Sequence, residues 1–110
     1  MKLPNCENAV VDITKLRDYS LNFEHEVGSH KARVFFIALN LGKEHAGWLR
    51  QQLLRIACND DAHPGLVSAF GQKYIVDAEL EYRNKVAIVR SVWIVENGTD
   101  FPRLVSCYVL

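Results

Sequence analysis

The chain has 110 residues, of which 49% are hydrophobic and 24% are charged, a composition typical of a folded domain and not of a disordered tail. This length suffices for one compact core, so residues 1–110 are expected to form a single domain. Basic and acidic residues balance to a net charge of zero, which argues against nucleic-acid binding through overall charge. No apolar run approaches the ~18 residues of a transmembrane helix, and the first residues lack the apolar core of a signal peptide.

Three cysteines, Cys6, Cys58 and Cys107, lie far apart in the sequence. Their odd number and wide spacing fit neither a disulfide framework nor a zinc site, and suit a reducing compartment. The four histidines have no cysteine or glutamate partner at metal-ligand spacing. We therefore expect a cytoplasmic protein with no metal site and no cofactor.

The first half of the chain predicts helices, over residues 12–19, 29–40 and 43–58. The pair Gly28-Ser29 marks the start of the second helix, because glycine ends a loop and serine is a good N-cap. Its apolar positions Ala32, Phe35, Phe36 and Leu39 follow helical spacing and should face the core. Residues 59–65 hold acidic residues, proline and glycine, and are predicted to form a loop.

The second half predicts strands, over residues 74–82, 86–95 and 104–110. A two-residue turn at Arg83-Asn84 fixes the register of the first two. The pairs that this turn sets opposite each other are Tyr74 and Trp93, Val76 and Ser91, Asp77 and Arg90, Ala78 and Val89, and Leu80 and Ala87. The fold class expected is α+β, with N-terminal helices packed on one face of a C-terminal antiparallel sheet of three or four strands.

Cationic and titratable residues gather between Leu21 and Phe36, where His25, His30, Lys31 and Arg33 lie close in sequence. Residues 29–58 carry a net charge of +4 in a chain that is neutral overall. A local basic face suits a phosphate-bearing target or a limited RNA contact, and an ordinary solvated helix surface is the alternative. In a helix, His30 and Arg33 share one face while Lys31 turns about 100° away.

Several segments resemble an uncharacterised family of small bacterial proteins: KLRDYSLN, HEVGSHKARVFF, FGQKYIV, RSVWIVENG and FPRLVSCYVL. That family's pattern combines KLxxYxLN, HxxGxxKAxxF, a strand with tryptophan and a closing LVTxY strand. The pattern is similar in turn to the broad ribonuclease superfamily that groups barnase, EndoU, the tRNA-cleaving colicins and RelE-like toxins. Phe70 and Ser106 depart from it, because the family has tyrosine and threonine there.

The resemblance implies a metal-independent endoribonuclease toxin of a bacterial toxin–antitoxin or polymorphic toxin system, with RNA as substrate and a cognate antitoxin encoded nearby. The catalytic residues it implies are His25, Lys31, Ser106 and Tyr108, and the substrate-binding residues are Lys15, His30, Arg33 and Trp93. RNA cleavage by the substrate's 2′-hydroxyl needs a base, an acid and cations for the charge on phosphorus. A histidine could exchange the protons, and the lysine, arginine and hydroxyl groups could hold the phosphate.

Two other functions stay open. The chain could be a non-catalytic protein-binding module on the antitoxin or immunity side, or an RNA-binding domain without cleavage activity. Strict alternation in the last strand places Leu104, Ser106, Tyr108 and Leu110 on one face. If the helices cover that face, Ser106 and Tyr108 form the wall opposite the first turn of the second helix.

Overall fold

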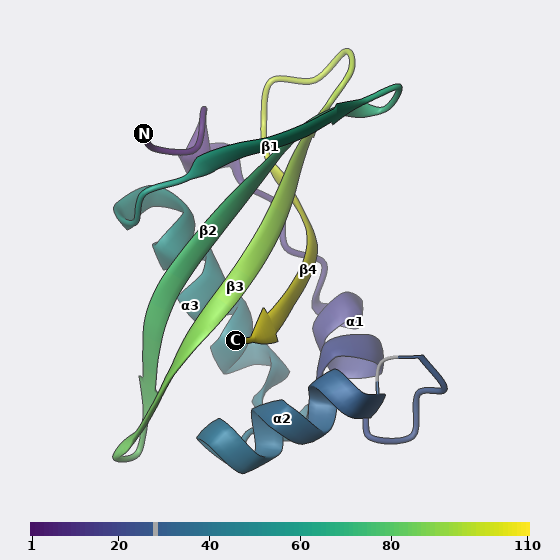
Figure 1. Ribbon diagram of the computed structural model, residues 1–110, viewed down its shortest axis with the longest axis vertical. Helices are drawn as coiled ribbons and strands as arrows, with labels where there is room; N and C mark the ends of the chain where they lie inside the picture. The colour runs from purple at the N-terminus through teal and green to yellow at the C-terminus, as the bar shows by residue number, and fades with distance from the viewer. Residues whose placement is uncertain (28) are drawn as a thin grey trace.

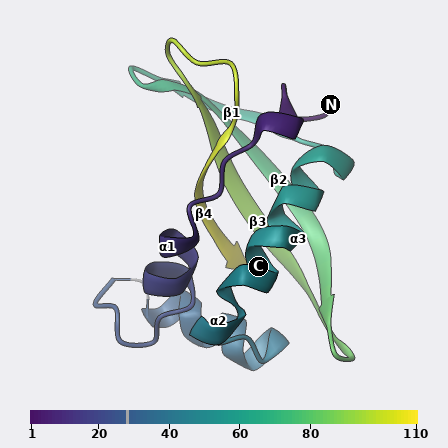
Figure 2. The same cartoon turned by 180° about the vertical axis from the view of Figure 1, so that it is seen from behind.

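The computed structural model of the protein describes residues 1–27 and 29–110. Its sheet has four antiparallel strands in the order β1-β2-β3-β4. In the described part of the chain, α3 and the N-terminal segment lie against one face of the sheet, α2 lies at the end of the sheet beside β3 and β4, and most of the other face is uncovered (Figure 1, Figure 2). The predicted α+β class with helices before strands is confirmed. The elements are η1 (Cys6–Asn8), α1 (Ile13–Lys15), η2 (Leu16–Ser20), α2 (Ser29–Leu39), η3 (Lys43–His45), α3 (Ala46–Asn59), β1 (His63–Ser68), β2 (Gly71–Tyr82), β3 (Lys85–Glu96) and β4 (Arg103–Val109).

The three predicted helices are present, with one change in character. The first consists of α1 followed by the π-helical turn η2, where the Leu21 N–H donates to the Leu16 carbonyl, five residues back, at 2.9 Å. The predicted boundary at Gly28 lies outside the described residues, and Ser29 is the first residue of α2. In the described part of the chain, no helix is both long enough and apolar enough to cross a membrane.

The β2–β3 hairpin has the predicted register, and all five predicted residue pairs are opposite each other. Arg83 and Asn84 form its turn with φ angles of 47° and 71°. Positive φ at both central residues is what a two-residue type I′ turn requires, and this turn type matches the twist of the flanking strands. Turn chemistry and alternation together therefore determine this register.

Two features of the sheet differ from the prediction. β1 begins at His63, inside the stretch predicted to be a loop, and Pro64 and Gly65 are tolerated there because β1 is an edge strand. In β4 the register shifts between Leu104 and Ser106, which leaves Val105 as an extra residue, a β-bulge.

The bulge changes which β4 side chains share a face. Leu104 and Cys107 both face the helices and are buried. Ser106 and Tyr108 pair with Val92 and Arg90 and lie on the opposite face. The prediction that Leu104, Ser106 and Tyr108 share one face is therefore wrong, because the extra residue inverts the alternation.

The core lies between the sheet and the helices. In α2 the predicted positions Ala32, Phe35 and Leu39 are buried, and α3 buries residues at the same helical period: Ala46, Leu49, Leu53, Ile56 and Ala57. Phe36 is an exception, because it is 48% exposed and stacks edge-on against Phe23. At the centre, Trp93 is fully buried and its Nε1–H donates to Ser91 Oγ at 2.9 Å.

A disulfide joins Cys6 to Cys58, so the expectation that the cysteines form none is wrong. The two residues are 52 positions apart in sequence, but the fold brings their Cα atoms to 5.2 Å. Cys107 is free, and burial raises the pKa of its thiol to about 12. Disulfides persist mainly in oxidising compartments, so the cysteines no longer argue for the cytoplasm.

Candidate functional site

A cleft of about 400 Å³ lies beside β4, between η2 and the first turn of α2. Its lining combines two lysines and three hydroxyl groups with an apolar wall, and consists of Lys15, Tyr19, Ser20, Lys31, Leu104, Val105 and Ser106. No carboxylate is among these residues. A concave site with cations and hydroxyl donors but no acidic group is suited to an anion.

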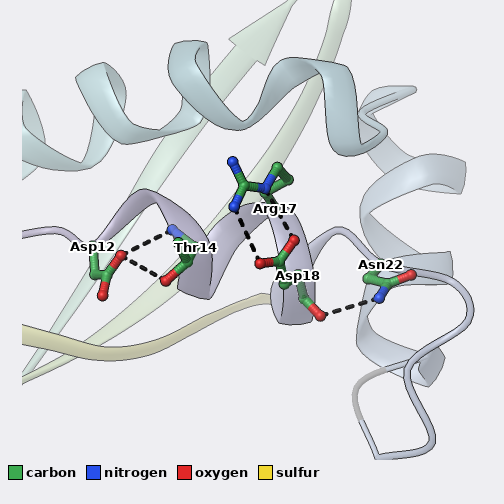
Figure 3. A network of polar contacts seen from close by, with 5 residues as sticks. All are labelled: Asp12, Thr14, Arg17, Asp18 and Asn22. Carbon is green, nitrogen blue, oxygen red and sulfur yellow. Dashed lines mark hydrogen bonds and ion pairs between the residues drawn. The ribbon is translucent and has the colours of Figure 1, made fainter.

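The segment that carries Lys15 and Tyr19 is fixed at its start by a helix cap. The carboxylate of Asp12 accepts hydrogen bonds from the backbone N–H and the hydroxyl of Thr14, at 2.9 and 2.7 Å (Figure 3). These bonds hold the pKa of Asp12 below its usual value. The cap fixes the start of α1, so the backbone of Lys15 lies in an ordered helical turn.

The same segment is closed at its end by contacts that Figure 3 also shows. The guanidinium of Arg17 donates to both carboxylate oxygens of Asp18, at 3.0 and 3.2 Å, and the Asn22 amide donates to the Asp18 carbonyl at 3.1 Å. The ion pair is exposed and adds little stability. The hydrogen bond from the Asn22 side chain, in contrast, satisfies a backbone carbonyl that the end of a helix leaves unpaired. The π-helical turn between these contacts carries Tyr19 and Ser20 into the cleft, and such turns are frequent at functional sites.

Lys31 reaches the cleft from the first turn of α2. Its Nζ lies 4.5 Å from the centroid of the Tyr108 ring, a cation–π contact. Within the described residues, neither Lys31 nor Lys15 has a carboxylate within 4.0 Å. Both ammonium groups can therefore still take an anionic partner.

An ion pair lies next to Tyr108 on the uncovered face of the sheet. Arg90, its cross-strand neighbour, donates two hydrogen bonds to Asp77, at 2.8 and 2.9 Å, as the sequence predicted. The pKa of Arg90 is raised by Asp77 first and then by the Tyr108 hydroxyl, and the guanidinium holds the pKa of Asp77 below its usual value. Tyr108 therefore has Arg90 as its neighbour on β3 and Lys31 of α2 over its ring.

We expect Asp77→Asn to destabilise the protein at neutral pH but not in acid. Because the pKa of Asp77 is lower in the folded state, its contribution is present above the unfolded value of about 3.9 and is lost as pH falls through the folded value. Urea unfolding at pH 7 and at about pH 2.5 should show the difference from wild type shrinking in acid. Asp100→Asn is the control. A difference in unfolding free energy between Asp77→Asn and wild type that is equal at both pH values would contradict the account.

The structure brings together residues from separate parts of the predicted site. Lys15, Lys31 and Ser106 line one cleft, and Tyr108 lies beneath Lys31. His25 does not line the cleft. Its ring packs edge-on against Tyr19 with centroids 4.5 Å apart, and its Nδ1 accepts the Val27 N–H at 3.1 Å, so it lies at the rim.

Three predicted residues lie elsewhere. His30 is exposed and is not part of the lining, and Arg33 lines a second, apolar hollow of about 320 Å³ with Phe23, Phe36 and Ile37. The interpretation of Trp93 as a substrate contact is wrong, because a fully buried indole whose N–H is bonded within the core cannot stack on a base.

Two lining residues, Tyr19 and Ser20, were not in the predicted site. Tyr19 could have been included, because it stands four residues after Lys15 in the KLxxYxLN pattern and residues at that spacing share a helix face. Ser20 carries no such signal. Its position depends on the π-helical turn, which adds a residue to the turn and which the sequence does not predict.

These observations define the class of the protein: an α+β domain with a basic cleft at one edge of its sheet. Residues 2–110 match the family described as a domain of unknown function (DUF6883), and the chain belongs to that family. The predicted membership of an uncharacterised family is thereby confirmed, whereas neither this match nor the structural one below identifies a ribonuclease superfamily. A comparison with curated proteins found no match.

Among solved structures, the fold is similar to a chain of a contact-dependent growth inhibition toxin–immunity protein complex from Klebsiella pneumoniae 342. The TM-score is 0.64 at 14% identity, and the alignment covers 94% of this chain and 95% of that chain. At this identity the likeness shows the fold alone.

Proposed function

We propose that the protein acts in a toxin system as a non-catalytic binding module on the immunity side, and that its basic cleft contacts the cognate toxin. The observation that carries this proposal is the chemistry of the cleft. Its lining can bind an anion through Lys15, Lys31 and hydroxyl groups, but includes neither a histidine nor a carboxylate. Metal-free RNA cleavage needs groups that accept and donate protons, and the lining holds no histidine, the side chain whose ordinary pKa lies nearest to neutral pH.

The fold comparison supports the same assignment. The solved structure with the similar chain is a toxin–immunity protein complex, and the likeness extends over almost the whole of both chains. A protein that acts by binding a partner needs an exposed, charge-complementary surface and no catalytic group. The cleft offers that surface.

The test is co-expression with the protein encoded by the adjacent gene. We expect the pair to form a stable complex, and this chain to restore growth of cells that the neighbour alone inhibits. The purified chain should leave cellular RNA intact with and without EDTA. RNA cleavage by this chain alone, lost in Lys31→Ala, would contradict the proposal.

RNA cleavage is the second candidate, and one observation favours it. Lys15, Lys31, Ser106 and Tyr108 converge from distant parts of the sequence, and His25 lies at the rim against Tyr19. In that function His25 would exchange protons while the lysines held the phosphate. It predicts cleavage that His25→Ala abolishes and the control His63→Ala leaves unchanged. RNA binding without cleavage would instead weaken as salt rises.

A further inference from the structure

Helix α2 carries large apolar residues on two of its sides. Ala32, Phe35 and Leu39 face the core and are buried. Phe36 and Ile37 lie on another side of the helix, where they are 48% and 71% exposed. A helix that packs against one core needs a single apolar stripe, with polar residues on its opposite face. The core of this protein therefore explains the first group of residues and not the second.

The exposed apolar residues surround a hollow of about 320 Å³, lined by Phe23, Arg33, Phe36 and Ile37. The last three are spaced three and four positions apart in α2, so they are neighbours on one helix face. Phe23 comes from the loop after η2 and meets Phe36 edge-on, with ring centroids 5.3 Å apart. Exposed apolar side chains that are grouped in this way are typical of a protein interaction site.

Arg33 gives the hollow a positive charge. It is exposed, and it is the charged residue of the lining. In the part of the chain that the structure describes, no carboxylate lies within 4.0 Å of its guanidinium. A guanidinium has a fork of N–H donors that matches the two oxygens of a carboxylate. A ligand that combines an apolar side chain with a neighbouring carboxylate is therefore complementary to this surface.

Residues 22–27 connect the hollow to the basic cleft. Phe23 lines the hollow, while His25 packs edge-on against Tyr19 with ring centroids 4.5 Å apart. Tyr19 in turn lines the cleft. The cleft and the hollow thus flank the same loop, so a protein that binds in the cleft and extends over this loop also reaches the hollow.

We infer that the hollow on α2 receives an apolar side chain of the protein partner, and that a carboxylate next to this side chain binds Arg33. The inference rests on the proposed function, because it adds a second contact region for the same partner. Burial of the exposed rings and of Ile37 supplies the apolar part of the interface, and Arg33 supplies the charged part.

Two other occupants fit the hollow less well. In a two-fold contact between copies of this chain, the same surface lies on both sides, so Arg33 would face a lining that holds no carboxylate. Single-stranded RNA binds by stacking its bases on aromatic rings. The most exposed apolar residue of the lining is Ile37, which is aliphatic and offers no ring for stacking.

The experiment measures binding to the protein encoded by the adjacent gene, by calorimetry, for Ile37→Gln and Arg33→Gln. Each variant should weaken the complex at least about tenfold, because each removes a group that the partner buries. The urea midpoint should stay that of wild type, because both side chains are exposed and glutamine is a good helix former.

The control variants change similar residues outside the hollow. Leu66→Gln replaces an apolar residue that is 79% exposed in β1, a strand at the opposite end of the molecule from α2 (Figure 1). Arg55→Gln removes an exposed guanidinium from α3. Both variants should bind the partner as tightly as wild type does.

The outcomes separate this inference from the proposed function. A complex that is as tight with Ile37→Gln and Arg33→Gln as with wild type overturns the inference and leaves the proposed function intact. Absence of any complex overturns both. A dimer of this chain that Ile37→Gln dissociates assigns the hollow to a second copy and overturns the inference. Binding of single-stranded RNA that the two variants abolish overturns both in favour of a nucleic-acid site.

Discussion

Trp93→Ala should lower the free energy of unfolding by about 3–5 kcal/mol, the range for removing a large aromatic side chain from a core. Trp93 is the largest fully buried side chain and lies in the same cluster as Phe35, Leu39 and Leu53. Alanine would leave a cavity between sheet and helices that rigid elements on both sides cannot fill. Urea unfolding followed by circular dichroism measures the loss.

Two matched variants separate the ring from its hydrogen bond. Trp93→Phe keeps most of the ring but leaves Ser91 Oγ without the indole N–H, although this hydroxyl still donates to the Val76 carbonyl at 3.1 Å. Ser91→Ala leaves the indole N–H buried and unpaired, which should cost about 1–3 kcal/mol. A Trp93→Ala loss below about 1 kcal/mol would place this residue outside the core and reopen a role in binding.

Cys58→Ser should also destabilise the protein strongly, by about 4 kcal/mol on the chain-entropy account of a loop of this length. The disulfide ties η1 to the last turn of α3. Without it the N-terminal segment is still held by packing, by the β-bridge between Val10 and Arg103 of β4, and by hydrogen bonds such as that from the Ala62 N–H to the Met1 carbonyl. Chemical unfolding with and without reductant measures the effect.

Reduction supplies the control for the disulfide. Reduced wild type should unfold at the same denaturant concentration as Cys58→Ser, and reductant should not change the variant further. Cys107 should resist alkylation in the native protein at pH 8, because it is buried and its pKa is raised to about 12. A wild-type midpoint that is unaffected by reductant would contradict a disulfide between Cys6 and Cys58.

The β2–β3 hairpin and the helical core were predictable, because local signals determine them. Alternation along residues 74–82 and the Arg83-Asn84 turn leave one register that buries the apolar set, and the structure has that register. The buried positions of α3 follow the helical period. In both cases the spacing of residues in sequence fixes their placement.

The remaining differences come from features without a local signal. β1 contains Pro64 and Gly65, and these residues predict a loop unless the strand is known to lie at the edge of a sheet. The bulge at Val105 follows from how β4 packs, and one extra residue moved Ser106 and Tyr108 to the other face. The disulfide likewise depends on a tertiary contact that sequence spacing does not reveal.

The site was predicted only in part, because its residues come together through tertiary contacts that have no local sequence signal. The resemblance pointed to Lys15, Lys31 and Ser106, and they line one cleft although no periodicity relates them. It also pointed to Trp93, which a strand with alternating apolar residues places equally well in the core. The role of these residues in binding or catalysis stays a prediction.

The most direct test of the account is the affinity of Lys15→Ala/Lys31→Ala for the protein encoded by the adjacent gene, measured by calorimetry beside wild type. Each lysine–carboxylate hydrogen bond is worth about 1.5–3 kcal/mol, so the double variant should bind at least about 100-fold more weakly while unfolding at the same urea concentration. Equal affinity of wild type and the double variant would contradict a toxin-binding role for the cleft.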